Sequence, residues 1–557
     1  MGLVMVKSVE SYSQPRIGFA RPRAGGRVAV LALLQLALLL LPGCAARPRM
    51  LPAEQQIPID RSLMTSPPGY SVRPFVRGLS APIAMAWDDE GSLIVAEGAN
   101  YDDEPRIIGF KKDGSFFQIY PYGRRMFVDI GKPRFTLYGP IGGMMVYKGR
   151  VYVSHRDEHD YGVITALDYT GGHTTIVAHI PAAGDYSMTD LTINPTVNPP
   201  RLYFGVGAAT NSGVVGIDNW DWVRGRPDVH DIPATKLRLM GFRFDSPNPF
   251  SGLFGPADIA VTAPFQPFNI SNQTEVSPGK FAGASIYSCV VNGGDVRLEG
   301  HGIRNPRGLG FNGFFVFFTN QGMELRGTRP IKDDPDSILR LGSGGGDWFG
   351  WPDYTTDLQS IELERYQPPL DMIARTGYPF HVLSVINKES SELAKPDSLS
   401  HRESLYGVFS PLSGVSKFDF VPGDSPLNRL HTRQAIVALS GDCAPFSTSG
   451  RPIKGPLGYK VVTVDFDRLS RNDPTKGTQN VTDFVANTAG GPGSKIDSKN
   501  PNLLERPVDV KFGKDGFVYI LDAGRMHMRD GRKEYEDGTG RIFILMPQTQ
   551  PMMYHGT

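Results

Sequence analysis

The sequence predicts an all-β protein that folds as one six-bladed β-propeller with long loop insertions. The first observation is a strand–turn–strand unit that returns six times along the 557 residues. The second is turn chemistry, because 64 glycines and 46 prolines supply the turns that many short strands need. The third is the lack of a long amphipathic helical pattern. Six such units fit radial blades, whose edges are short and protected.

Each copy of the unit has a proline or polar start, an alternating strand, a turn and a second strand that ends in small or polar residues. The copies start at Pro82, Pro140, Met188, Pro306, Gly414 and Pro507, and a further strand follows each one. The stretch YSVRPFVRGLS from Tyr70 should supply the outer strand of the last blade and close the ring. Two separate β-sandwiches would not explain six equivalent copies. We therefore place the propeller at residues 70–549, with a tail at 550–557.

The N-terminus has the pattern of a secretory signal. Five basic residues precede the apolar run at 28–41, which is too short to span a bilayer comfortably, and LPGC ending at Cys44 follows. LPGC resembles the bacterial lipobox, which predicts a signal peptide over residues 1–43 and a lipid on Cys44. A plain secretory signal cut nearby is the alternative. Either way the protein is expected to be exported, with residues 44–69 as a tether.

Charge and cysteine usage exclude several functions. Removal of residues 1–43 changes the formal charge from +1 to −3, so the mature chain lacks the basic surface that nucleic acid requires. No later segment is apolar enough to be a membrane helix. Cys289 and Cys443 remain, without a CxxC motif. They belong to the third and fifth copies, so we expect both thiols to be free.

Two stretches interrupt the repeat. The longer one, at residues 210–280, is rich in proline, glycine and aromatic residues and contains NWDW from Asn219 to Trp222. Loops of this length in a compact domain are usually functional or form small packed excursions, so we expect a partial lid on one face. A second excursion runs from Asp353 to about Leu412.

The stretch from His301 to Gly322 is the strongest candidate site. Arg304 and Asn305 close one strand, and Asn320-Gln321-Gly322 ends the next, so polar groups stand at both ends of a buried β unit. Arg304 could clamp a ligand, or it could fix a loop through an ion pair.

Several motifs in order, GIRNP, TNQG, RGTRPI, DPDSILRL and GGDWFGWPDY, resemble the glucose/sorbosone dehydrogenase family. These are soluble quinoprotein sugar dehydrogenases that use pyrroloquinoline quinone and calcium on a six-bladed propeller. The resemblance implies that Arg304, Asn305 and Gln321 bind the quinone. It also implies that the carbonyls of Gly322 and Met323 bind calcium, although Met323 replaces the family's proline.

Further basic residues could hold the carboxylates of the quinone. The resemblance points to Arg451 and Lys454 in GRPIKGPLGYKVV and to Arg506 in ERPVDV. Each of them could instead pair with Asp442, Glu505 or Asp509.

The family's general base is a histidine just before the third copy. Here that stretch is GDYSMTDLTI, which places Asp185 and Tyr186 at the catalytic position. With ordinary pKa values of ~3.9 and ~10, neither side chain replaces histidine unless its pKa is shifted. His155 and His159 could bind a transition metal, but a polar turn between strands explains them as well.

Two functions follow. The first is an exported quinoprotein-like oxidoreductase that oxidises a sugar or related alcohol or aldehyde by hydride transfer to pyrroloquinoline quinone. The alternative is a non-catalytic cell-surface propeller that binds a carbohydrate or a protein partner. A propeller hosts both, so the site must decide. The first function predicts that Arg304, Asn305, Gln321 and Arg506 converge on one axial pocket.

Overall fold

The computed structural model describes residues 47–122, 135–250, 259–269, 273–373, 381–391, 393, 402–429, 434–466, 480–529 and 531–548. The predicted signal peptide, the lipid attachment at Cys44 and the tail at 550–557 lie outside these residues. Within them, no helix has the length and hydrophobicity needed to cross a bilayer.

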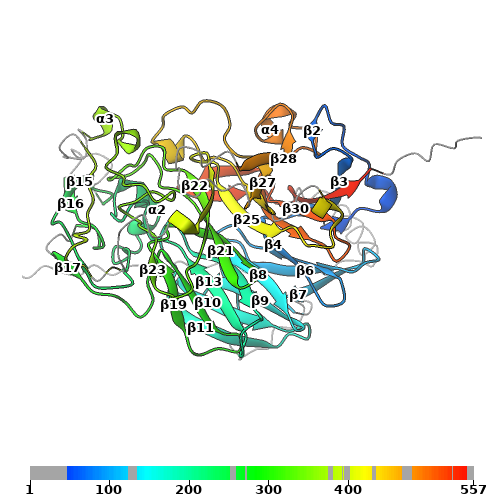
Figure 1. Ribbon diagram of the computed structural model, residues 1–557, viewed down its shortest axis with the longest axis horizontal. Helices are drawn as coiled ribbons and strands as arrows, with labels where there is room; N and C mark the ends of the chain where they lie inside the picture. Colours follow the sequence, from blue (N-terminus) through cyan, green and yellow to red (C-terminus); the bar gives the residue numbers. More distant parts are fainter. Residues whose placement is uncertain are drawn as a thin grey trace, which may run out of the picture. The chain divides into compact units, whose positions relative to one another are not determined.

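Six sheets form the blades, each with its strands in order from the axis outward (Figure 1). Neighbouring strands are antiparallel, except that the short outermost strand of the third blade pairs parallel with its neighbour. The first three blades contain β4 (Pro82–Trp87), β5 (Leu93–Glu97), β6 (Arg106–Phe110) and β7 (Phe116–Tyr120); β8 (Tyr138–Tyr147), β9 (Arg150–Arg156), β10 (Tyr161–Leu167) and β11 (His173–Pro181); and β12 (Met188–Asn194), β13 (Arg201–Val206), β18 (Ser285–Val290), β19 (Arg297–His301) and the short β23 (Asp347–Trp348).

The last three blades continue in the same way. They contain β20 (Pro306–Asn312), β21 (Phe315–Asn320), β22 (Asp336–Arg340) and β24 (Leu405–Phe409); β25 (Val415–Phe420), β26 (Gln434–Leu439), β27 (Lys460–Asp465), β28 (Val481–Asn487) and β2 (Met64–Thr65); and β29 (Pro507–Phe512), β30 (Val518–Asp522), β33 (Gly540–Pro547), β3 (Tyr70–Leu79) and β1 (Arg49–Met50). The inner strands β4, β8, β12, β20, β25 and β29 contact one another in that order, and β29 returns to β4. The predicted six-bladed ring is therefore confirmed.

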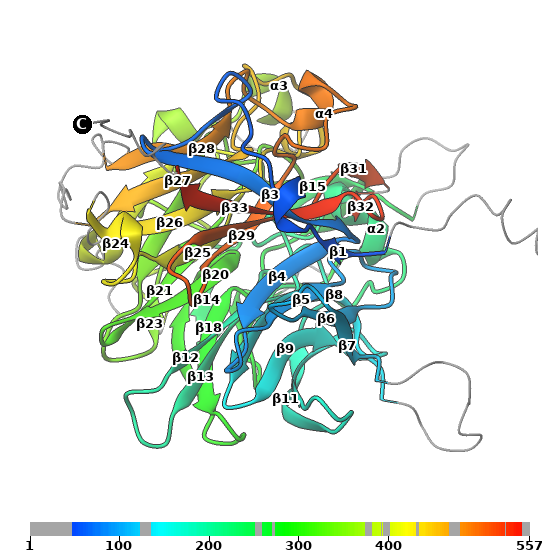
Figure 2. The ribbon, with the colours of Figure 1, turned by 90° about the vertical axis from the view of Figure 1, so that its right-hand side faces the viewer.

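The ring closes as the sequence predicts. Strand β3 pairs with β33 from the far end of the chain, with Tyr70 opposite Pro547, and Figure 2 shows the two strands side by side. Apolar side chains from neighbouring blades fill the space between the sheets, as Ile94 and Val153 do between the first two. Charged side chains lie on the axis, where Lys417 Nζ pairs with Asp190 at 3.1 Å and donates to the Gly142 carbonyl at 2.8 Å.

The structure corrects the expectation of a free tether up to residue 69. From Arg47 the chain lies on the propeller, because β1 pairs with β3 and β2 pairs with β28. Leu51, Ile59 and Met64 are buried, and they anchor a segment whose prolines conceal any regular period. The excursion after Asp353 likewise ends in β24, the fourth strand of its blade.

The remaining elements are short. The insertion forms α2 (Trp220–Val223) and two small sheets, β14 (Leu237–Arg238) with β17 (Glu275–Val276) and β15 (Phe244–Pro247) with β16 (Ile259–Thr262). Within the described residues the other helices are α3 (Leu370–Ile373) and α4 (Gly493–Ile496). In the same part of the chain, 3₁₀ turns lie at Ala53–Gln55, Ile217–Asn219, Glu364–Tyr366, Arg402–Ser404, Pro426–Arg429 and Phe446–Thr448. A hairpin of β31 (Met526–Arg529) and β32 (Arg532–Tyr535) follows β30.

Candidate functional site

A cavity of about 370 Å³ lies where the turns before and after the inner strands meet. This volume falls within the range of small-ligand pockets, ~300–1,000 Å³. The β31–β32 hairpin and helix α2 of the insertion complete its wall, with Met528, Arg532 and Lys533 from the hairpin and Asp221, Trp222 and Arg226 from the insertion. The long insertion therefore contributes directly to the cavity.

Four of the residues that the sequence singles out line this cavity: Asp185, Tyr186, Asn305 and Gln321. Asn305 Nδ2 donates to Gln321 Oε1 at 2.8 Å, so the two amides are held against each other. The turn before β12 carries Asp185 and Tyr186, and the turns flanking β20 and β21 carry the amides. Equivalent turns in neighbouring blades thus face one space, as the repeat predicts.

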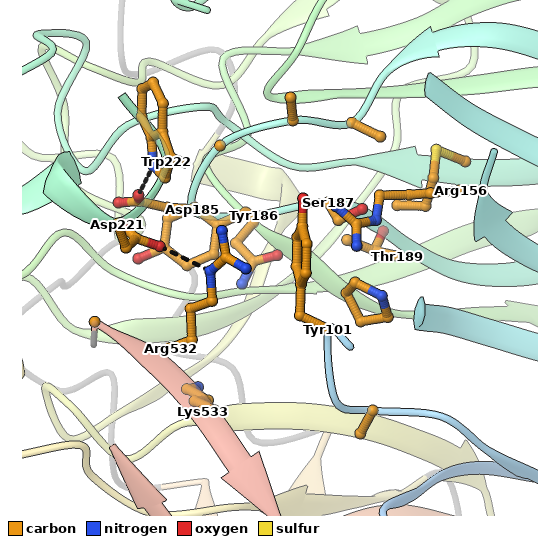
Figure 3. A pocket seen from close by; sticks show the side chains of 18 of the residues that line it. Tyr101, Arg156, Asp185, Tyr186, Ser187, Thr189, Asp221, Trp222, Arg532 and Lys533 are labelled. Atoms are coloured by element: carbon orange, nitrogen blue, oxygen red, sulfur yellow. Dashed lines mark hydrogen bonds and ion pairs between the residues drawn. The ribbon is translucent and has the colours of Figure 1, made fainter. Parts of the chain in front are cut away.

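Asp185 is held in place by three donors. Its Oδ1 accepts from Trp222 Nε1 at 2.8 Å (Figure 3). The same oxygen accepts from Asn219 Nδ2 at 2.9 Å, while Arg326 donates to Oδ2 at 2.6 Å. Each of these bonds occupies a lone pair that a general base would need for the substrate proton. Burial raises the pKa of Tyr186, so its phenol stays protonated at neutral pH. Neither side chain, as placed, has the properties of a general base.

Arg304 does not line the cavity. Its side chain is 1% exposed and lies behind Tyr186, whose hydroxyl accepts from Nη2. Asn211 accepts from Nε at 3.0 Å through its carbonyl and from Nη2 at 2.8 Å through its side chain. The carbonyls of Gly322 and Gln321 accept from Nη1 at 2.6 and 3.4 Å. All five N–H donors of the guanidinium are therefore used by the protein.

These contacts do not fit the calcium site that the resemblance implies. A metal ion on the Gly322 carbonyl would stand beside the Arg304 guanidinium that already uses this oxygen, so two cations would share one acceptor. The Met323 side chain is buried, and its N–H donates to Asp334 at 2.7 Å. Across the described residues no group of three acidic, histidine or cysteine side chains could hold a metal.

We expect millimolar calcium to leave the stability of the apoprotein unchanged. The carbonyl that should bind the ion accepts from Arg304, and displacing a buried guanidinium would cost more than a weak metal site returns. The measurement is the melting temperature with calcium and with a chelator. A rise in melting temperature that saturates with calcium would contradict this expectation.

The other basic residues expected at the quinone lie away from the cavity. Arg506 donates to the carbonyls of Ser440, Gly441 and Asp442 at 2.8 to 3.1 Å. Arg451 forms an exposed ion pair with Asp371 at 2.5 Å, and Lys454 is exposed. The expectation that Arg304 and Arg506 converge on the axial pocket with Asn305 and Gln321 is therefore corrected.

The histidines also do not form a metal site. His155 is buried between the Arg156 carbonyl and the Thr165 hydroxyl, at 2.6 and 2.8 Å, and burial lowers its pKa to about 4. His159 is 72% exposed. The polar-turn interpretation holds for this pair.

The cavity wall contains a basic residue that was not predicted from the sequence. Arg307 on β20 lines it, and among the described residues it has neither a hydrogen bond nor an ion pair through its side chain. Burial lowers the pKa of Arg307, so its charge is poorly solvated. Lys533 of the hairpin faces the same cavity and is also unpaired within the described chain, but it is exposed.

The remaining cations of the wall are neutralised. Arg326 binds Asp185, Asp218 and Glu324 at 2.6, 2.7 and 2.5 Å. Arg156 pairs with Asp160, and Arg532 pairs with Asp221 at 3.2 Å. The guanidinium groups of Arg156 and Arg532 cover the two faces of the Tyr101 ring, 3.5 and 3.8 Å from its centroid (Figure 3). Arg226 pairs with Asp228 at 3.1 Å, so among the described residues of the wall Arg307 and Lys533 are the cations without an ion pair.

Cys443 lies on the cavity wall and is half-buried, whereas Cys289 is fully buried in its blade. Both thiols are free, as expected. Burial raises the pKa of Cys289 to about 12. We expect an alkylating reagent to modify Cys443 and to spare Cys289 in the native protein, because the thiolate is the reactive form. Mass spectrometry of the digested protein reads both sites, and modification of Cys289 at the rate of Cys443 would contradict the expectation.

No family model and no curated protein sequence matches the chain. Solved structures similar to it include the PQQ domain of pyranose dehydrogenase from Coprinopsis cinerea, with 15% identity over 88% of this chain and 98% of that chain and a TM-score of 0.48. A carbohydrate-active enzyme of family AA12 from Trichoderma reesei gives 13% identity, coverage of 87% and 98%, and a TM-score of 0.48. PQQ-bound aldose sugar dehydrogenase from Streptomyces coelicolor gives 12% identity over 86% of this chain and 99% of that chain, with a TM-score of 0.43.

Proposed function

We propose that this protein is an oxidoreductase that binds a carboxylated quinone in its axial cavity and oxidises a sugar or a related alcohol or aldehyde there. The observation that carries the proposal is Arg307, a cation in a ligand-sized cavity with no protein partner among the described residues. An unpaired, poorly solvated charge is costly, and an anionic ligand would offset that cost.

Pyrroloquinoline quinone fits these residues as a class of ligand. It carries three carboxylates, and Arg307 and Lys533 are cations that could accept them, with the Asn305 and Gln321 amides beside them. When bound, a quinone supplies a hydride acceptor. The proposal does not include calcium, because Arg304 uses the carbonyl that the ion would need.

The test is a titration of purified protein with pyrroloquinoline quinone, followed through tryptophan fluorescence, since Trp222 lines the cavity. We expect saturable binding that is the same with calcium and with a chelator. Reduction of an electron-accepting dye over a panel of sugars, alcohols and aldehydes then identifies turnover. Lack of quinone binding at high micromolar concentration would overturn the proposal.

A second candidate is a non-catalytic propeller that binds an anionic carbohydrate or a protein partner in the same cavity. The fixed Arg304 and the lack of histidine among the described residues of the cavity wall favour it. Acidic sugars that bind the protein and protect Cys443 from alkylation, without quinone binding, would support this candidate over the first.

Export with a lipid on Cys44 remains part of the proposal. LPGC and the apolar run before it support this location. We expect Cys44→Ala to move the protein from the membrane fraction to the soluble fraction. An unchanged distribution would leave a plain secretory signal as the better account.

A further inference from the structure

Among the described residues that line the axial cavity are four carboxylates, and they differ in how many protein groups donate hydrogen bonds to them or pair with them. Asp185 accepts from three donors, as described above. Asp160 accepts from Tyr101 and Arg156, at 2.9 and 2.8 Å, and lies 3.9 Å from Arg226. In both groups, protein donors or a guanidinium already face the carboxylate oxygens.

Glu324 is held as an anion. Burial would raise its pKa, but Arg326 and Arg304 outweigh burial and hold the pKa below its ordinary value. Arg326 Nε donates to Glu324 Oε2 at 2.5 Å, and Arg304 Nη2 lies 3.6 Å from the same oxygen. This carboxylate serves the arginine network of the wall.

Asp221 is different. From other residues of the described chain it accepts one side-chain hydrogen bond, from Arg532 Nε to Oδ2 at 3.2 Å (Figure 3). Its own backbone N–H also donates to the carboxylate, and no other residue of the described chain donates to Oδ1. Its side chain is 11% exposed and lies on the cavity wall. Oδ1 is therefore sheltered from bulk water and next to the space that a substrate would enter.

The surroundings of Asp221 hold it in position. Helix α2 is anchored by Trp222, which is 7% exposed and donates to Asp185. Arg532 reaches Asp221 from the hairpin and is itself fixed over the Tyr101 ring. Asp221 is thus fixed from both sides, and its one ion pair crosses from the insertion to the hairpin.

We infer that Asp221 is the general base that takes the proton from the substrate hydroxyl, at a site where the third-copy turn provides no histidine. The inference rests on the proposed function. The O–H proton moves to Asp221 Oδ1, the adjacent C–H bond breaks with its electron pair leaving as hydride to the quinone, and the carbon–oxygen bond becomes a carbonyl. The substrate is oxidised and the quinone, the oxidant of the proposed function, is reduced.

The electrostatics agree with this role. Burial and the nearby Asp185 raise the pKa of Asp221 to about 6, although Arg532 opposes the rise. A carboxylate with this pKa is ionised at neutral pH, yet it is roughly 100-fold more basic than an ordinary aspartate. Burial raises the pKa of Asp231 further, to about 7, but its oxygens accept from Thr210 and from the Ala209 N–H, and it is not part of the cavity wall.

The test compares Asp221→Asn with Asp245→Asn. Asp245 is an exposed acid on β15 of the same insertion and does not line the cavity, so its replacement controls for the loss of one charge. We expect Asp221→Asn to lower turnover by ~10²–10⁴-fold, the usual contribution of a general base. Quinone affinity at pH 7 should stay equal or become tighter, because one negative charge is removed from the cavity. Asp221→Glu should recover part of the turnover.

The dependence on pH gives a readout that needs no turnover. As pH falls through about 6, Asp221 becomes neutral, so wild-type protein should bind the anionic quinone more tightly while its turnover declines. In Asp221→Asn both changes should become clearly smaller without vanishing, because burial also raises the pKa of Asp218, which binds Arg326 of the same wall, to about 6. Asp245→Asn should keep the wild-type changes.

Three outcomes are distinguishable. If Asp221→Asn binds quinone and keeps turnover within about threefold of wild type, Asp221 is not the base, while the proposed function stands. If the variant keeps the wild-type pH dependence of binding, the titrating group is another residue and the inference fails. If the wild-type protein binds no quinone, the proposed function fails, and this inference fails with it.

Discussion

Replacing Arg307 with methionine is expected to weaken quinone binding by ~10–150-fold, which corresponds to ~1.5–3 kcal/mol for a hydrogen bond to a charged group. Arg307 is a half-buried cation of the cavity wall, placed there by the inner strand β20, and its side chain has no hydrogen bond or ion pair in the part of the chain that the structure describes. A ligand carboxylate would supply the partner. Methionine keeps much of the side-chain length but removes the charge.

The same variant should not destabilise the apoprotein. Burial lowers the pKa of Arg307, which means that its charge is unfavourably placed when the cavity is empty. We expect an unchanged free energy of unfolding, or a gain of up to ~1–2 kcal/mol, since replacing a poorly compensated buried charge by an apolar side chain is often stabilising. Such an exchange of stability for binding is typical of functional sites.

Two measurements check this prediction: the quinone affinity from fluorescence and the free energy of unfolding from a urea titration. Arg451→Met is the matched control, because Arg451 is an exposed residue paired with Asp371 away from the cavity. The control should change neither quantity appreciably. An Arg307 variant that unfolds more readily and binds quinone normally would show that Arg307 is structural.

The fold could be predicted because it depends on local patterns. Each copy begins a blade, and the six inner strands begin within two residues of the predicted starts, from Pro82 to Pro507. Closure of the ring by Tyr70–Leu79 could also be predicted, because this strand did not belong to any of the six copies. The packing of residues 47–69 on the propeller could not be predicted. A few buried apolar side chains such as Leu51 and Met64 anchor this segment, and they do not recur at a regular spacing.

The site could be predicted only as far as chain topology determines it. The turn before β12 and the ends of β20 and β21 must face the axis, so Asp185 and Gln321 reach the cavity. Arg304 occupies an equivalent turn, but Asn211, 93 residues away in the insertion, accepts from its guanidinium and holds it outside the cavity. No local pattern reports such a contact.

Two sequence patterns could have predicted more of the site. The stretch MHMRDGRKEY alternates around an Asp-Gly pair, which is a strong hairpin pattern, and it forms β31 and β32 with Arg532 and Lys533. NWDW marks the insertion segment that carries Asp221. Arg307 stands three residues after Arg304, and which of the two arginines faces the cavity depends on partners that only the structure reveals.

Replacing Arg304 with alanine is expected to destabilise the protein by ~3–5 kcal/mol, the usual cost of removing one partner from a buried charged network. Five N–H donors would disappear, and the acceptors on Asn211, Gly322 and Tyr186 would lose their partner in a region where Arg304 itself is 1% exposed. Arg304→Lys should recover only part of the loss, because one ammonium cannot replace a planar group that binds three sides of its site.

Urea unfolding of Arg304→Ala beside Arg451→Ala measures this effect, and the exposed Arg451 should change stability by no more than ~0.5 kcal/mol. Quinone titration of whichever Arg304 variant remains folded then separates the two roles that the sequence allows. If the variant is less stable, and its loss of quinone binding equals the fraction of unfolded protein, Arg304 has a structural role behind Tyr186. The opposite outcome is a variant with wild-type stability and a tenfold or greater loss of quinone affinity. That result would mean that Arg304 contacts the ligand, as the motif resemblance implies. Its contacts with Gly322 and Asn211 would then break when the ligand binds.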